Sequence, residues 1–200
     1  HEIKNPLTSL RSAVETAARI RDPEQQQKLM AIIQEDVQRL DRLITDISNA
    51  SRLDSELSRA EAETIDIADM LATLHEIYSA GDTQTEVALK ISGEPPFRVA
   101  AIEDRLVQVF RNLLQNAISF SPPSGRVTLR LARRESNIEI NVCDDGPGIP
   151  DGKLDAVFNR FYTERPEGEK FGTHSGLGLS ISKQIVEAHG GSIRAENRYT

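Results

Sequence analysis

The chain has 200 residues, 38% of them hydrophobic, which allows one large domain or two small ones. It carries 24 Lys and Arg against 31 Asp and Glu, a net charge of −7, which disfavours a nucleic-acid partner because such binding usually needs a basic face. The only cysteine, Cys143, cannot form an internal disulfide, which fits a reducing compartment. No apolar run approaches the roughly 18 residues of a membrane span. We therefore expect this piece of chain to be cytoplasmic and to make no membrane contact.

Residues 1–60 contain no glycine, and their apolar residues recur alternately three and four positions apart, the spacing of a helical seam. Asp22-Pro23-Glu24 supplies an N-cap, a proline at the first helical position and an early acid, so a second helix should begin there. We predict two helices joined by a short turn. Their seam residues are Ile3, Leu7, Leu10, Val14 and Ala17, then Met30, Ile33, Val37, Leu40, Ile44 and Ile47.

Two helices cannot bury such a seam by themselves. One alternative is a dimer in which two hairpins form a four-helix bundle. The other is a monomeric hairpin that lies on the rest of the chain. The seam persists through the whole second helix, and this favours the dimer.

Residues 58–63 have the composition of a linker, and the chain beyond them has a different pattern. Residues 1–60 carry 9 basic and 10 acidic side chains, a net −1, which leaves −6 for residues 61–200, and all 12 glycines follow residue 80. Helices on one side and strands on the other predict an α/β two-layer sandwich. The predicted domains are 1–60 and 64–200. Strands are expected at 65–67, 87–91 and 192–195, a hairpin over 126–142, and helices through 70–77, 102–120 and 177–189, the last ended by Gly190-Gly191.

His1, Glu2 and Asn5 form the first candidate site. On a helix, His1 and Asn5 are four residues apart and share a face. One imidazole nitrogen is a fair nucleophile near neutral pH, Glu2 could accept the proton from the other, and Asn5 could orient a water or a phosphoryl oxygen. The alternative is that Asn5-Pro6 is only an N-cap followed by proline at the first helical position, with His1 a frayed end.

Asn112 and Asn116 lie four residues apart in the predicted helix 102–120. Asparagine is a poor residue for a helix interior, so two on one face of an apolar helix need a reason. A carboxamide oxygen is a suitable ligand for a Mg²⁺ ion that also contacts nucleotide phosphates. The alternative is a pair of solvated asparagines.

Two glycine-rich segments complete the candidate site. The segment 144–149 follows a strand, where Asp144 can accept a hydrogen bond from an exocyclic amine and the glycines let a ligand approach the backbone. The segment 176–179 opens a helix, whose first N–H groups favour phosphate. The charged stretch 162–175 before it is typical of a mobile lid, with Phe158 and Phe161 as candidate hinges. An ordinary Asp-Gly turn and a surface loop are the simpler alternatives.

In this order the motifs closely resemble the catalytic core of a two-component sensor histidine kinase. The resemblance spans essentially the whole chain, and residues 1–20 and 116–122 are also similar to the ChvG/BvrS-type envelope-stress kinases of alphaproteobacteria. The matching segments are the H box (1–7), the N box (112–117), the first glycine box (144–149), the F box (158–161) and the second glycine box (176–179).

The resemblance implies a dimerisation and phosphoacceptor hairpin followed by an ATP-binding domain of the Bergerat type, with ATP and Mg²⁺ as cofactors. It implies autophosphorylation of His1, with Glu2 as acid/base partner, and phosphotransfer to an aspartate of a response regulator. Asn5 would assist dephosphorylation of that regulator. The implied nucleotide-site residues are Asn116 on Mg²⁺ with Asn112 beside it, Asp144 on the adenine amino group, and Gly146, Gly148, Gly176, Leu177 and Gly178 around the nucleotide and lid.

Some features depart from the family pattern. Ser119 stands where many relatives carry Lys or Arg near the phosphates, so Lys170, Arg165 or Arg160 is expected to supply that charge. The chain also ends where the family usually continues into a last strand, and it starts without an initiator Met. We therefore expect a longer parent protein in the bacterial inner membrane, and the missing membrane span describes only the piece given.

Two other functions stay open. A gyrase-type ATPase or clamp module predicts ATP turnover without phosphate on His1, and the seam and H box count against it. A non-catalytic dimeric scaffold predicts no Mg-ATP binding, and the intact Asn116 and Asp144 count against it.

Overall fold

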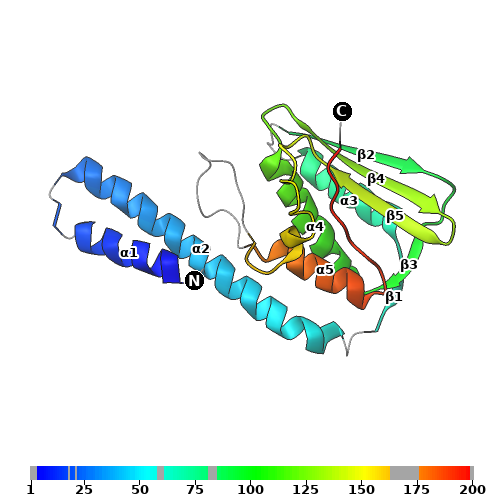
Figure 1. Ribbon diagram of the computed structural model, residues 1–200, viewed down its shortest axis with the longest axis horizontal. Helices are drawn as coiled ribbons and strands as arrows, with labels where there is room; N and C mark the ends of the chain where they lie inside the picture. The colour runs from blue at the N-terminus through cyan, green and yellow to red at the C-terminus, as the bar shows by residue number, and fades with distance from the viewer. Residues whose placement is uncertain are drawn as a thin grey trace.

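The computed structural model describes residues 4–17, 19–20, 22–57, 61–80, 85–162 and 176–198. Figure 1 shows two parts, a long helical hairpin and a unit of helices packed on strands. His1, Glu2, Lys170 and residues 163–175 of the predicted lid lie outside the described residues.

The hairpin consists of α1 (Lys4–Ala17) and α2 (Pro23–Leu57), and α1 lies along the N-terminal half of α2 (Figure 1). The predicted helix start is confirmed, because the Asp22 Oδ1 accepts a hydrogen bond of 3.0 Å from the Glu24 N–H. Helix α1 already contains Asn5, so Asn5 is not the residue that caps its N-terminus. The C-terminal half of α2 runs beside the second part, and Ile47 packs against its core.

The strands of the second part form two sheets. Strand β1 (Glu63–Asp66) pairs antiparallel with β3 (Arg98–Ala101). In the larger sheet, ordered β2-β4-β5, β2 (Glu86–Ser92) runs parallel to β4 (Arg126–Arg134), which forms the predicted hairpin with β5 (Asn137–Cys143). Strand β3 was not expected from the sequence, and Ile67 begins the following helix rather than ending a strand.

The helices cover one face of this sheet, which confirms the predicted two-layer sandwich (Figure 1). They are α3 (Ile67–Ala80), α4 (Glu103–Phe120) and α5 (Gly178–Ala188), with a short 3-10 turn η1 (Ala156–Phe158) before the predicted lid. The apolar faces of helices and sheet meet in one core. Its most completely buried side chains are Phe97, Ile67, Leu71, Leu114, Leu129, Leu131, Leu177, Ile185, Val109 and Val127.

At the end of α5, the predicted helix end is confirmed, whereas the strand predicted after it is not found. The helix ends at the predicted glycines, since Gly190 has φ +73° and the Gly191 N–H donates to the Val186 carbonyl at 3.0 Å. The strand predicted at 192–195 is wrong, because residues 191–198 run past β5 without strand pairing (Figure 1). Arg194 of this segment still affects β5, because the pKa of Glu139 is lowered by the hydrogen bond from Asn141 and then by the charges of Arg134 and Arg194.

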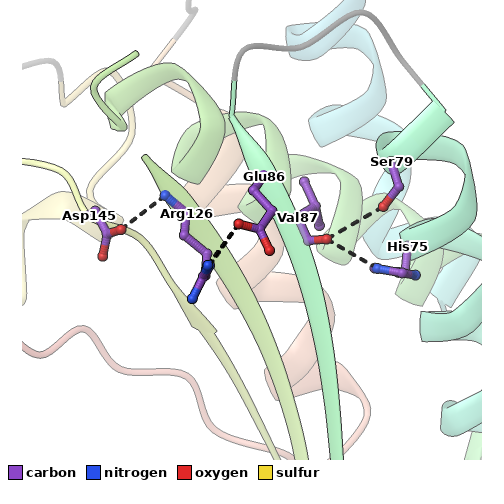
Figure 2. Close-up of polar contacts among 6 residues, drawn as sticks. All are labelled: His75, Ser79, Glu86, Val87, Arg126 and Asp145. Carbon is purple, nitrogen blue, oxygen red and sulfur yellow. Dashed lines mark hydrogen bonds and ion pairs between the residues drawn. The ribbon is translucent and has the colours of Figure 1, made fainter. Parts of the chain in front are cut away.

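Strand β2 forms one edge of the larger sheet, and helix α3 covers part of that edge. The Val87 carbonyl accepts a hydrogen bond from the His75 Nε2 at 3.1 Å and a long one from the Ser79 hydroxyl at 3.5 Å (Figure 2). Among the described residues, no helix combines the length and apolar character needed to cross a membrane.

Candidate nucleotide-binding site

A large open cavity brings together most of the predicted nucleotide-site residues. It extends along β4 and β5 and reaches the place where α4 and α5 face the loop that follows β5, and the C-terminal segment 191–198 forms part of its wall. Leu177 differs, because its side chain is 2% exposed and belongs to the core. The predicted residues that line the cavity are Asn112, Asn116, Asp144, Gly146, Gly148, Gly176 and Gly178.

The two asparagines of α4 have different surroundings. The Asn112 side-chain amide donates to the Gly178 carbonyl at 3.1 Å and lies 3.4 Å from the Ser182 hydroxyl, so it ties α4 to the start of α5. The Asn116 side chain makes no hydrogen bond with any described residue. Its carboxamide is therefore the one of the pair that is available to a ligand in the cavity.

The loop 144–150 presents Asp144 at the end of β5. The Gly146 N–H donates to the Asp144 Oδ1 at 2.9 Å, which orients the carboxylate within its own turn. A Cβ on Gly146 would lie 2.7 Å from that oxygen and 2.9 Å from the Phe120 carbonyl oxygen, so only glycine fits there.

Gly178 differs from Gly176 in its backbone conformation. Gly176 has φ +69°, a backbone conformation that favours glycine, whereas Gly178 has no positive φ. A Cβ on Gly178 would come no closer than 3.6 Å to Asn112, which is ordinary contact. Gly178 begins α5, where the first backbone N–H groups have no partner in the helix and favour phosphate. Neither its backbone conformation nor its neighbours therefore requires glycine at this position.

The two residues that flank the predicted lid are hydrogen-bonded to each other. The Phe161 N–H donates to the Gly176 carbonyl at 2.9 Å, and Phe161 has φ +64°. Of the candidate hinges, Phe158 is 9% exposed and Phe161 is 37% exposed. Phe158 is therefore a core residue at the start of this segment, while Phe161 lies at the surface.

Asp145 joins the loop to the sheet (Figure 2). Its Oδ2 accepts a hydrogen bond of 2.9 Å from the Arg126 backbone N–H, and the Arg126 guanidinium donates to the Glu86 Oε2 at 2.8 and 3.0 Å. The first residues of β2 and β4 are thus linked to the residue next to Asp144. This network was not predicted, since nothing in the local sequence pairs residues so far apart.

Within the described part of the chain, the structure shows none of the three expected basic residues, Lys170, Arg165 and Arg160, at the cavity near Ser119. The Ser119 hydroxyl donates to the Asn116 carbonyl at 3.0 Å. Arg160 is exposed and is not among the residues that line the cavity. Lys170 and Arg165 lie outside the described residues.

Sequence reasoning also missed three residues around the site. Asn197 and Arg198 reach back from the C-terminal segment to the loop after β5. His189 accepts a hydrogen bond of 3.0 Å at Nε2 from the Ile102 N–H and donates from Nδ1 to the Ile185 carbonyl at 2.8 Å, so it joins the start of α4 to the end of α5. None of these contacts has a local sequence signal.

Family models match both parts of the chain. The model described as "Histidine kinase-, DNA gyrase B-, and HSP90-like ATPase" matches residues 101–200, and "His Kinase A (phospho-acceptor) domain" matches residues 1–56. The chain therefore belongs to the family of histidine kinase-, DNA gyrase B- and HSP90-like ATPases and carries a histidine kinase A domain before it.

Among curated proteins, the chain is 51% identical over 205 residues to Sensor protein ChvG of Rhizobium meliloti (strain 1021), covering 98% of this chain and 36% of that protein. It is 51% identical to Sensor protein ChvG of Agrobacterium fabrum (98% and 34% covered) and 30% identical to Sensor histidine kinase WalK of Bacillus subtilis (98% and 33% covered). The resemblance to ChvG-type kinases is confirmed, and the chain spans about a third of the length of these relatives.

Solved structures of histidine kinases are also similar to this chain. Histidine kinase ThkA in complex with response regulator protein TrrA aligns with a TM-score of 0.73 and 26% identity, covering 99% of this chain and 55% of that one. The mycobacterial sensor histidine kinase MprB aligns with a TM-score of 0.57 and 33% identity over 66% of this chain and 83% of that one.

Proposed function

We propose that the chain is the core of a sensor histidine kinase that phosphorylates itself on His1 with ATP and passes the phosphoryl group to an aspartate of a response regulator. Residues 1–60 would be the dimerisation and phosphoacceptor domain, and 64–200 the ATP-binding domain. The observation that carries this proposal is the cavity that joins Asn116, Asp144 and the start of α5, in a chain that also holds a phosphoacceptor-type hairpin.

The donors around the cavity fit Mg-ATP. ATP supplies the phosphoryl group when bound, and Mg²⁺ offsets the charge of its phosphates. Asp144 would accept a hydrogen bond from the adenine amino group, Asn116 would ligate Mg²⁺ through its free carboxamide oxygen, and the N-terminus of α5 at Gly178 would hold phosphate. Asn112 would act by holding α5 against α4, given its bond to the Gly178 carbonyl.

The remaining roles fall on residues at the start of the chain. His1 would be the nucleophile, and Glu2 would take the proton from the imidazole nitrogen that does not attack. Asn5, one helical turn from His1, would assist dephosphorylation of the regulator.

A homodimer is supported by the hairpin seam. Large apolar side chains of the seam stay exposed in the single chain, with Ile44 60%, Met30 52% and Val37 50% exposed. Burying them against a second hairpin removes apolar surface from water. A response regulator as partner is supported by the solved relative ThkA, whose structure is a complex with one. We place the fragment in the cytoplasm and its parent in the bacterial inner membrane.

Labelling with γ-labelled ATP and Mg²⁺ tests this function. We expect an acid-labile, base-stable phosphoprotein, no label in His1→Gln, and unchanged ATP affinity in that variant. Label that survives His1→Gln would overturn the assignment of His1. ATP turnover without label would instead favour the gyrase-type ATPase, and absence of Mg-ATP binding would favour the scaffold.

The metal ligand is tested separately. Asn116→Ala should weaken Mg-ATP-dependent labelling, whereas the control variant Thr73→Ala, at an exposed residue of α3 that does not line the cavity, should leave it unchanged. An unchanged rate in Asn116→Ala removes this residue from the metal site.

A further inference from the structure

Two consecutive residues of the C-terminal segment hold the loop 144–149. The Asn197 side chain bonds to both backbone groups of Ile149: its Oδ1 accepts from the Ile149 N–H at 2.8 Å, and its Nδ2 donates to the Ile149 carbonyl at 2.7 Å. The Arg198 guanidinium donates to the Asp144 carbonyl and to the Asp145 Oδ1, the latter at 3.2 Å. The loop is therefore attached near both of its ends.

Gly148 is shaped to receive this attachment. It has φ +79°, and a Cβ there would lie 3.0 Å from the Asn197 Oδ1. A side chain at 148 would therefore be strained by its backbone and would press on the amide of Asn197. The second glycine of the loop allows the Asn197 amide to come close, so the loop and the C-terminal segment fit one another.

The contact between Asn197 and Ile149 is connected to the Asp144 carboxylate through the loop residues that lie between Asp144 and Ile149. The Gly146 N–H sets the orientation of that carboxylate, and the Phe120 carbonyl lies so close to Gly146 that a Cβ there would come within 2.9 Å of its oxygen. A displacement of Ile149 would move Gly148 and Gly146, and with them the donor that orients Asp144.

We infer that Asn197, assisted by Arg198, is a positioning residue that sets the place of the Asp144 carboxylate and so the recognition of the nucleotide base. This inference rests on the proposed function, in which Asp144 contacts adenine. It assigns base recognition partly to a segment that carries none of the sequence motifs.

Calorimetric titration of the chain with ATP and with inorganic tripolyphosphate, both with Mg²⁺, tests the inference. Tripolyphosphate has no base, so its binding does not depend on Asp144. Asn197→Ala removes two hydrogen bonds, and we expect ATP to bind about tenfold more weakly, while tripolyphosphate affinity changes less than about twofold. Arg198→Ala should act in the same direction.

Thr73→Ala is the matched control, because it also removes a side-chain hydrogen bond to the backbone, from the Thr73 hydroxyl to the Asp69 carbonyl, at an exposed position of α3 outside the cavity. It should leave both affinities unchanged. Unchanged ATP affinity in Asn197→Ala would overturn the inference, and so would an equal loss for ATP and tripolyphosphate, since that indicates a general structural role.

Asp144→Asn separates this inference from the proposed function. If Asp144→Asn leaves ATP affinity unchanged, the adenine contact in the proposed function is wrong. Amide hydrogen exchange at Gly146 then still decides whether Asn197 positions the loop, because it needs no nucleotide. We expect faster exchange at Gly146 in Asn197→Ala than in wild type or Thr73→Ala, and equal rates would overturn the positioning role.

Discussion

The hairpin and the α/β unit bury their apolar side chains to very different extents. In the α/β unit, ten large side chains are less than 2% exposed, so its core is complete within one chain. Among the described side chains of the hairpin, Ala13 is the one buried apolar residue, while Leu7, Val14, Met30 and Val37 are each about half exposed. The difference teaches that the α/β unit is stabilised by its own core, whereas the hairpin leaves apolar surface exposed that the proposed homodimer would bury.

The largest expected effect is in the α/β core. Leu71 on α3 is 0% exposed, so Leu71→Ala leaves a cavity and should lower the free energy of unfolding by about 3 kcal/mol. Leu7→Ala removes the same atoms from a hairpin residue that is 49% exposed in the single chain, and in the monomer it should cost less than about 1 kcal/mol. Urea unfolding of both variants measures the difference. Equal losses would contradict the contrast between the two parts.

A smaller effect is expected on assembly. Ile44→Glu places a charge on the hairpin seam and should raise the dimer dissociation constant at least about tenfold in sedimentation experiments, with no change in the melting of the α/β unit. Ile77→Glu is the matched control, because Ile77 on α3 is 61% exposed and Ile44 is 60% exposed. If both variants dissociate the dimer equally, the seam is not its interface.

The third effect separates the two asparagines of α4. Asn112→Ala removes the tie from α4 to the Gly178 carbonyl and should lower the free energy of unfolding by about 1 kcal/mol without nucleotide. Asn116→Ala removes no such bond, so its stability should stay within about 0.5 kcal/mol of wild type. Chemical unfolding of the apo protein checks this, and the reverse order would assign the structural role to Asn116.

The smallest effect belongs to an exposed ion pair of the hairpin. The Lys28 Nζ lies 2.9 Å from the Glu24 Oε1, with both side chains more than 70% exposed. Lys28→Ala should change the free energy of unfolding by less than about 0.5 kcal/mol, because water and salt screen such pairs. A loss above 1 kcal/mol in thermal unfolding would show that the pair is part of a larger contact.

The elements that were predicted correctly show a clear periodicity of hydrophobic residues within their own sequence. Helix α4 was expected from Leu106, Val109, Phe110, Leu113 and Leu114, which are spaced for one face and pack as expected. The β4–β5 hairpin was predicted from alternation on both sides of its turn. Such patterns are local, because each residue is compared with neighbours two positions away in a strand and three or four positions away in a helix.

The failures concern contacts between distant residues. The segment 192–195 alternates like a strand, but a strand needs a partner, and its neighbours Asn197 and Arg198 bond to the loop after β5 instead. Strand β3 has only four residues, too few to show a period. The candidate site was predicted from motifs, whereas the different surroundings of Asn112 and Asn116 depend on where α5 packs, which spacing along one helix does not reveal.

The edge of the larger sheet bears on how copies of the chain meet. An uncovered edge strand offers backbone groups on which a second chain can add a strand, which is a common route to aggregation. At β2, the Val87 carbonyl is already taken by His75 and Ser79 (Figure 2). Two copies held close together through their hairpins would therefore meet a blocked acceptor at this edge, which disfavours strand addition there.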